Sequence, residues 1–372
     1  MPLGISNNCK NIAPSATLAM DAKAKAMRAA GVDVIGFAAG EPDFDTPVPV
    51  RDAMKDALDK GMTRYTAAAG TAELRDAIAY RLKADHGLAY GQNQIIVTNG
   101  AKHALYTAFQ SLCSEEDEVI IPTPCWVSYP EMVRMAGGKS VLVECPEENG
   151  FLPSMEDIEA VITERTKAFV LTNPSNPNGN IWDEERLRAL VQLAVDKQFY
   201  IIADEIYEHI NYVGKHASMA EFEDIRDRVV IINGVSKAYA MTGWRIGFIA
   251  APEWVVKGCN KLQGQYTSGP CSVSQKAAEA ALHTVKVQRL RHMGGQVAVE
   301  GAGVGGIVDA IGIAFPLSIK PCMKIGIDIH ACQHPDIRRQ AGVEGKGVLV
   351  RRDAAEGIEM HALPHGVYAR VG

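Results

Sequence analysis

The alternation of short apolar runs with amphipathic segments constrains the fold of this 372-residue chain more than any other feature. Segments such as 101–112, 154–162 and 183–197 repeat apolar residues every three or four positions, as amphipathic helices do. Runs with the length and composition of buried strands lie at 94–100, 117–124, 167–174, 199–205, 228–234 and 245–252. Strands that alternate with helices predict an α/β fold with a mostly parallel sheet.

Composition limits the partners that such a chain can have. With 47% hydrophobic and 22% charged residues it can bury a sizeable core, and its length suggests a large domain with a smaller one. A formal net charge of −6 argues against nucleic acid or an anionic membrane as partner, so we expect small-molecule substrates. No apolar run reaches the roughly 18 residues of a membrane span, the start lacks a signal-peptide pattern, and eight scattered cysteines fit reduced thiols. We therefore expect a cytoplasmic protein.

Parallel sheets collect their chemistry at the carboxyl ends of the strands, so the residues after each apolar run are candidates for a site. Gly100 permits a tight turn, and a helix beginning near Ala101 would present free N–H groups to an anion such as phosphate. In "TNPSNPNG" the prolines hold the backbone, which leaves the Asn176 amide as a rigid donor. Taken singly, the first stretch is weak evidence, because most strand-to-helix turns bind nothing, and the second is equally well explained as an ordinary proline-braced turn.

The next two strand ends carry ionisable groups. Asp204 ends an apolar run, where a carboxylate is costly unless a cation meets it, and Tyr207 follows three residues later. Lys237 follows another run, and a lysine partly removed from water near a second cation has the lowered pKa that Schiff-base chemistry requires. Arg245 can supply that cation and bind a dianion together with the Ser236 hydroxyl. A helix-capping aspartate, a solvated lysine and a surface arginine are the open alternatives.

These residues together suit a ligand with a phosphate, a ring nitrogen, a phenolic oxygen and an aldehyde, the groups of pyridoxal phosphate. The ordered motifs are "GEPDFDTP", "YTAAAGTAELRDAIA", "WVSYPEMV", "NPSNPNG", "DEIYEH" and "NGVSKAYAMTGWRIGF". On these motifs, residues from about 10 to about 283 resemble the class I, fold type I pyridoxal-phosphate aminotransferases, close to the bacterial aspartate and aspartate/prephenate enzymes. The resemblance implies ping-pong transfer of an amino group from an amino acid such as aspartate to a 2-oxo acid such as 2-oxoglutarate.

The resemblance also implies roles for individual residues. Lys237 would bind the cofactor aldehyde and move the substrate Cα proton, and Asp204 would pair with the ring nitrogen. Tyr207 and Asn176 would hold the phenolic oxygen. Trp126 would stack on the ring, and Tyr65 would reach the phosphate of the neighbouring subunit. The phosphate would be bound by backbone N–H groups of Gly100, Ala101 and Lys102 together with Ser236 and Arg245. The residues that would contact the substrate are Gly40, Trp126 and Asn176. A site shared in this way implies a homodimer, and no metal is expected.

The end of the chain departs from the family's pattern. Relatives carry a "GAFY"-like segment and an arginine in an "R-x-S-Y"-like strand for the substrate α-carboxylate, and neither motif occurs after residue 285. We predict an arm with part of the small domain (1–44), a large cofactor domain (45–285) and an atypical segment (286–372) in place of the family small domain. A shifted reading frame or an unrelated replacement is our hypothesis for that segment. Without the arginine, a cofactor-binding protein that is inactive or impaired, or a lyase on the same scaffold, remains an alternative.

Two further patterns in this segment suggest other chemistry. Gly301, Gly303 and Gly306 match the dinucleotide-binding pattern G-x-G-x-x-G, and Asp328 follows about 20 residues later. Too little chain follows to complete a six-stranded dinucleotide domain. A loose metal-ligand spacing at 330–334 has no second cluster at the distances that zinc sites use. We expect neither a nicotinamide cofactor nor a metal.

Overall fold

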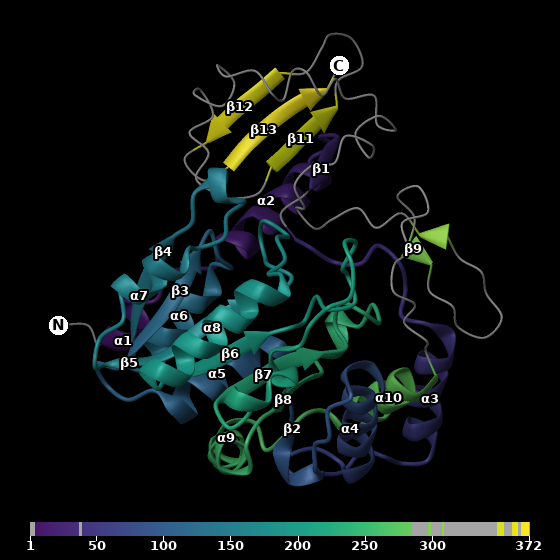
Figure 1. Cartoon of the computed structure of the whole chain (residues 1–372). Helices are drawn as coiled ribbons and strands as arrows, with labels where there is room; N and C mark the ends of the chain where they lie inside the picture. The colour runs from purple at the N-terminus through teal and green to yellow at the C-terminus, as the bar shows by residue number, and fades with distance from the viewer. Residues whose placement is uncertain are drawn as a thin grey trace.

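The computed structural model describes residues 4–36, 39–284, 297–298, 307–308, 348–352, 359–363 and 366–371. Its centre is a seven-stranded sheet in the order β2-β8-β7-β6-β5-β3-β4 (Figure 1). The strands are β2 (Ile95–Thr98), β3 (Glu118–Thr123), β4 (Lys139–Glu144), β5 (Thr166–Thr172), β6 (Tyr200–Asp204), β7 (Val229–Gly234) and β8 (Gly247–Ala250). The strand β8 runs antiparallel to both of its neighbours, β2 and β7, and the other six strands of this sheet run in one direction. The mostly parallel sheet and the six strands expected from apolar runs are confirmed.

Helices cover both faces of the sheet, which explains why its strands are continuously apolar. One face packs against α4 (Ala72–His86), α7 (Met155–Ala160), α8 (Glu184–Lys197) and α10 (Ser272–Thr284). The other face packs against α5 (Ala101–Leu112), α6 (Ser128–Met135) and α9 (Glu253–Tyr266). Side chains alternate between these two cores along β6, so that Ile201 and Ala203 enter the first and Ile202 the second.

Local sequence sets several helix ends. Ser15 caps α2 (Ala16–Ala29) by accepting a hydrogen bond from the Leu18 N–H, and Asp183 caps α8 in the same way through the Arg186 N–H. The helix expected at 101–112 is found at those bounds as α5, and the one expected at 154–162 is shorter. Short 3₁₀ helices lie at Gln92–Gln94, Glu147–Asn149, Met219–Glu221, Glu223–Ile225 and Thr242–Trp244.

The N-terminal arm forms a second sheet with strands from the end of the chain. The arm contains α1 (Asn7–Lys10), α2 and β1 (Val34–Gly36), and β1 pairs antiparallel with β11 (Val348–Arg352). The order is β1-β11-β13-β12, completed by β13 (Gly366–Val371) and β12 (Glu359–Leu363), and this sheet lies beside α2 in Figure 1. A separate pair joins β9 (Val297–Ala298) to β10 (Ile307–Val308). The domain boundaries at 44 and 285 stay a prediction.

The helix α3 (Val48–Asp59) connects the arm to the large domain and packs against α10. Among the residues that the structure describes, no helix is long and apolar enough to cross a membrane.

Candidate active site

The carboxyl edge of the central sheet gathers most of the candidate residues. The strands β2, β3, β5, β6 and β7 end at this edge, and the antiparallel β8 begins there. Gly247, the first residue of β8, pairs with Thr98 of β2 on one side and with Gly234 of β7 on the other. Residues that are far apart along the chain therefore meet where open α/β sheets bind ligands.

Lys237 lies in the loop after β7 and is half-buried. Its Nζ donates a hydrogen bond to the Gly40 carbonyl and lies 5.7 Å from the centroid of the Tyr207 ring. Burial lowers the pKa of Lys237; the charge of Glu41 opposes this shift and that of Arg245 adds to it. A lysine whose amine loses its proton more readily suits covalent chemistry with a carbonyl group.

Asp204 ends β6 and is only 3% exposed. Its Oδ2 accepts a 2.7 Å hydrogen bond from the Tyr129 hydroxyl, and its Oδ1 accepts one from the Ile206 N–H at 3.3 Å. Burial raises the pKa of the Asp204 carboxyl to about 6, although both hydrogen bonds oppose the shift. A buried carboxylate of this kind is ready to pair with a cationic group of a ligand.

Tyr129 is a site residue that the sequence analysis missed. It lies in the first turn of α6, is 1% exposed, and its hydroxyl lies 2.7 Å from both the Thr172 Oγ1 and the Asp204 Oδ2. Because the hydroxyl donates to Asp204, Thr172 is the donor in the other contact. The motif "WVSYPEMV" contains Tyr129, but its partners lie 43 and 75 residues away, beyond any local pattern.

Asn176 and Tyr207 contact each other, and their shared role at a phenolic oxygen stays a prediction. The Asn176 Nδ2 donates to the Tyr207 hydroxyl at 3.3 Å, and burial, reinforced by the charge of Asp204, raises the Tyr207 pKa well above its usual range. Trp126 lies edge-on to Tyr129, with ring centroids 5.3 Å apart. The exposed Lys102 places its Nζ 4.7 Å from the centroid of the Trp126 ring, so its side chain adds a cation to the edge of the site.

The turn into α5 requires glycine at position 100. Gly100 has φ 84°, a left-handed conformation that L side chains rarely adopt, and a Cβ there would also meet the Arg245 guanidinium. A Cβ at Gly247 would clash with the backbone nitrogen of Ala101. Arg245 donates from Nη1 to the Thr242 carbonyl at 2.8 Å and from Nη2 to the Asn99 carbonyl at 3.3 Å. The first N–H groups of a helix have no partner in a preceding turn, so this corner suits an anion.

The remaining candidates stand as follows. Ser236 is buried beside Lys237. Tyr65 is 97% exposed, and its contact with a neighbouring subunit stays a prediction. The pattern Gly301, Gly303 and Gly306, and the spacing at 330–334, lie outside the described residues.

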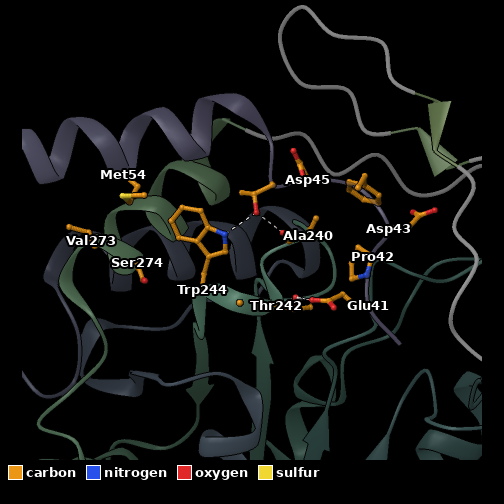
Figure 2. Close-up of a pocket in the computed structure, with 13 residues that line it drawn as sticks. Glu41, Pro42, Asp43, Asp45, Met54, Ala240, Thr242, Trp244, Val273 and Ser274 are labelled. Carbon is orange, nitrogen blue, oxygen red and sulfur yellow. Dashed lines mark hydrogen bonds between the residues drawn. The ribbon is translucent and has the colours of Figure 1, made fainter. Parts of the chain in front are cut away.

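A cavity of about 630 Å³ lies next to the lysine loop (Figure 2). It is lined by residues 41–46, by Met54 of α3, by Ala240 and residues 242–244 of the loop that follows Lys237, and by Val273 and Ser274 of α10. Within the loop, Thr242 donates a hydrogen bond to Glu41, which joins the two walls of the cavity. The sequence analysis did not anticipate this space.

Behind Tyr207 lies a buried ionic cluster that was also missed. His86, at the end of α4, contacts Glu208 through Nε2 at 2.8 Å and Glu221 through Nδ1 at 2.9 Å. Glu205, Glu208 and His216 offer ligand atoms within 4.8 Å of one another, but both Glu208 oxygens already contact histidines. Since Glu208 directly follows Tyr207, the cluster anchors the chain that carries the tyrosine.

Comparison with known proteins gives one consistent result. The family model described as Aminotransferase class I and II matches residues 32–297. The chain is 52% identical over 272 residues to the aspartate aminotransferase of Bacillus subtilis, covering 73% of this chain and 69% of that protein. It is 44% identical over 286 residues to the aspartate/prephenate aminotransferase of Thermus thermophilus, covering 77% and 74%. A solved structure of the Thermus thermophilus aspartate aminotransferase with maleate superposes with a TM-score of 0.74 at 44% identity, over 76% of this chain and 73% of that one.

Proposed function

The chain belongs to the class I and II aminotransferases, and we propose that it transfers the amino group of aspartate, or of another dicarboxylic amino acid, to a 2-oxo acid such as 2-oxoglutarate. Membership in this family implies pyridoxal phosphate as cofactor and a ping-pong order of substrates. The observation that carries the proposal is the half-buried Lys237 beside Gly40 and Tyr207, with the buried Asp204 at the same edge of the sheet.

The anion-binding corner of the site fits a phosphate group. N–H groups of the first turn of α5, the Ser236 hydroxyl and the Arg245 guanidinium are donors suited to a dianion. The glycine at position 100 leaves open the space that a Cβ would close against Arg245. We assign the cofactor phosphate to this corner.

The opposite side of the site fits a pyridine ring with a phenolic oxygen. The buried Asp204 carboxylate suits a protonated ring nitrogen, and its hydrogen bond from Tyr129 keeps it oriented. The Asn176 amide and the neutral Tyr207 hydroxyl suit the phenolic oxygen. Trp126 supplies an aromatic face for stacking on the ring.

When bound, pyridoxal phosphate supplies an electron sink for the charge that develops at the substrate Cα. Lys237 would hold the cofactor aldehyde and, once the substrate amine has taken its place there, would carry the proton that leaves the substrate Cα. Its lowered pKa makes the amine more readily available as a base than that of an ordinary lysine. The Gly40 backbone, within reach of the lysine, contacts the substrate α-carboxylate in this proposal.

A dicarboxylic substrate needs a cation for its second carboxylate. With Lys237 assigned to the aldehyde and Arg245 to the phosphate, Lys102 is the cation whose side chain contacts the aromatic wall of the site. We assign Lys102 to this role in addition to its backbone contact. The relatives named as aspartate aminotransferases, and the neighbour with maleate, agree with a dicarboxylate.

The proposal includes a homodimer, in which the exposed Tyr65 would contact the cofactor phosphate of the neighbouring subunit. A cytoplasmic location stays a prediction.

The experiment is an absorbance titration of the purified protein with pyridoxal phosphate, followed by aspartate and then 2-oxoglutarate. We expect a visible band that Lys237→Ala abolishes and that the exposed-lysine control Lys197→Ala retains. Aspartate should bleach the band and 2-oxoglutarate should restore it, while alanine acts weakly. A band that no amino acid changes would overturn the transaminase proposal in favour of a cofactor-binding protein without turnover, and bleaching by alanine and aspartate alike would overturn the dicarboxylate preference.

A further inference from the structure

Residues 40–46, which we call the strap, connect the N-terminal arm to α3 and run alongside the loop that carries Lys237. At one end of the strap, the Gly40 carbonyl accepts a hydrogen bond from the Lys237 Nζ, and Glu41 accepts one from the Thr242 hydroxyl. The strap has no regular secondary structure, so no ladder of backbone hydrogen bonds holds it in place. Its position relative to the loop depends on such individual contacts.

The other end of the strap is held by one hydroxyl group. The Thr46 Oγ1 donates to the Ala240 carbonyl at 2.6 Å and accepts a hydrogen bond from the Trp244 Nε1 at 2.9 Å. The dashed lines between Trp244 and Ala240 in Figure 2 mark these two bonds. Thr46 is 8% exposed, so water competes little for the groups that make these two hydrogen bonds. A single buried side chain thus joins the strap to two points of the lysine loop.

The loop needs such support because its backbone is strained at two places. Ala240, three residues after Lys237, has φ 52°, and Arg245 has φ 58°. A left-handed conformation costs a non-glycine residue about 1 kcal/mol or more, and it persists only where surrounding contacts hold it. The carbonyl that Thr46 binds belongs to the first of these residues.

Packing does not replace these hydrogen bonds on the open side of the strap. All of residues 41–46 line the cavity of about 630 Å³, so the strap has empty space against it there. Loss of the Thr46 contacts would therefore let the strap move into the cavity. The Gly40 carbonyl and the lysine loop would then lose their fixed separation.

We propose that Thr46 and Trp244 are positioning residues, which lock the strap to the loop and so hold the Lys237 amine and the Gly40 backbone in register for the reaction. This inference rests on the proposed function, because it concerns the same lysine. Neither side chain touches the reacting atoms. Thr46 acts through Ala240, whose carbonyl sets the course of the chain three residues after the lysine, and Trp244 acts through the Thr46 hydroxyl.

The test compares Thr46→Val, which removes the hydroxyl at nearly constant volume, and Trp244→Phe, which removes the indole N–H and keeps an aromatic ring, with the control Thr166→Val. Thr166 has a similar exposure of 9% and accepts a 2.8 Å hydrogen bond from the Thr163 N–H at the amino end of β5, away from the site. Thr46→Ser, which keeps the hydroxyl, serves as the rescue variant. The full-length protein is used throughout.

The first readout is independent of activity. The rate of reductive methylation of Lys237, followed by peptide mass spectrometry as a function of pH, reports the pKa of its amine. Glu41, Arg245 and Tyr207, the ionisable groups that face the lysine, are unchanged in these variants. In Thr46→Val and Trp244→Phe the loosened loop admits water, so the Lys237 pKa should rise toward that of an ordinary lysine, whereas Thr166→Val and Thr46→Ser should match the parent protein.

The second readout is steady-state kinetics of the cofactor-loaded enzyme. Each of the two variants should lower kcat about tenfold, because small misplacements of reacting groups are costly. The double variant should be little worse than either single one, since both remove the same connection. Parent-like values of both the Lys237 pKa and kcat, or changes no larger than those in Thr166→Val, would overturn the inference. Failure of the parent protein to react with aspartate would refute the proposed function instead, and the methylation profiles would still decide the role of the strap.

Discussion

Replacement of Asp204 by asparagine should stabilise the cofactor-free protein while strongly lowering the activity of the cofactor-loaded enzyme. Burial raises the pKa of this carboxyl from 3.8 to about 6. The folded state therefore binds the proton more tightly than the unfolded state, and the ionised carboxylate opposes folding. This cost is absent below about pH 4, grows as the pH rises, and is fully present above about pH 6.

The magnitude follows from the shift. About two pKa units correspond to about 3 kcal/mol of destabilisation at neutral pH. Asparagine removes the charge and keeps an oxygen for the Tyr129 hydroxyl, but its amide group then faces the Ile206 N–H, at a cost of about 1 kcal/mol. We expect a net gain of about 1 to 2 kcal/mol in the free energy of unfolding.

The assay is urea unfolding of the cofactor-free parent and Asp204→Asn proteins between about pH 4 and pH 8. The variant should be the more stable protein at the upper end, and the difference should shrink as the pH falls. The kcat of the same variant should fall at least about a hundredfold, because asparagine has no negative charge to stabilise the protonated ring nitrogen of the cofactor. A variant less stable than the parent at pH 8, or a difference that does not vary with pH, would refute this reasoning.

Three further predictions follow from single contacts. Tyr129→Phe removes a hydrogen bond that lowers the pKa of Asp204, so that pKa should rise. The acid limb of the plot of kcat/KM against pH should then move up by about one pH unit. An acid limb at an unchanged pH would contradict this prediction. Gly100→Ala places a Cβ against Arg245 in a left-handed backbone. A fluorescence titration should therefore show at least about tenfold weaker binding of pyridoxal phosphate. Unchanged affinity would argue against the assignment of the cofactor phosphate to this corner of the site. Burial alone would lower the pKa of His86, but its hydrogen bonds to two glutamates and nearby negative charge raise it to about 9. The stability that this histidine contributes is therefore present below pH 6.5 and is lost as the pH rises through about 9. Urea unfolding of His86→Gln should lack that loss, and parallel pH dependences in variant and parent would count against the assignment.

Much of the fold could be predicted because parallel strands covered on both faces must be apolar along their whole length. The runs ending near Thr98, Thr172 and Gly234 are strands for this reason. The strand β4 was missed because it lies at the edge of the sheet, with the exposed Lys139 and Leu142 among its side chains, and its apolar run covers only residues 141–143. The antiparallel direction of β8 could not be predicted, since an apolar run does not indicate in which direction its strand runs relative to the neighbouring strands.

The candidate site was predictable wherever a functional residue follows a strand. Asn176, Asp204, Tyr207 and Lys237 all come shortly after apolar runs, and the shared edge of the sheet brings them together. Their chemical types also matched the family motifs.

What the sequence by itself determined is the order of strands and helices along the chain and the set of reactive groups at the strand ends, because both depend on residue type and local spacing. Only the tertiary structure decided which groups contact one another. Tyr129 meets Asp204 across 75 residues, and Thr46 meets Ala240 across 194. Such contacts depend on how the sheet and the strap pack, and the same packing removes water from Asp204 and Lys237 and thereby shifts their pKa values.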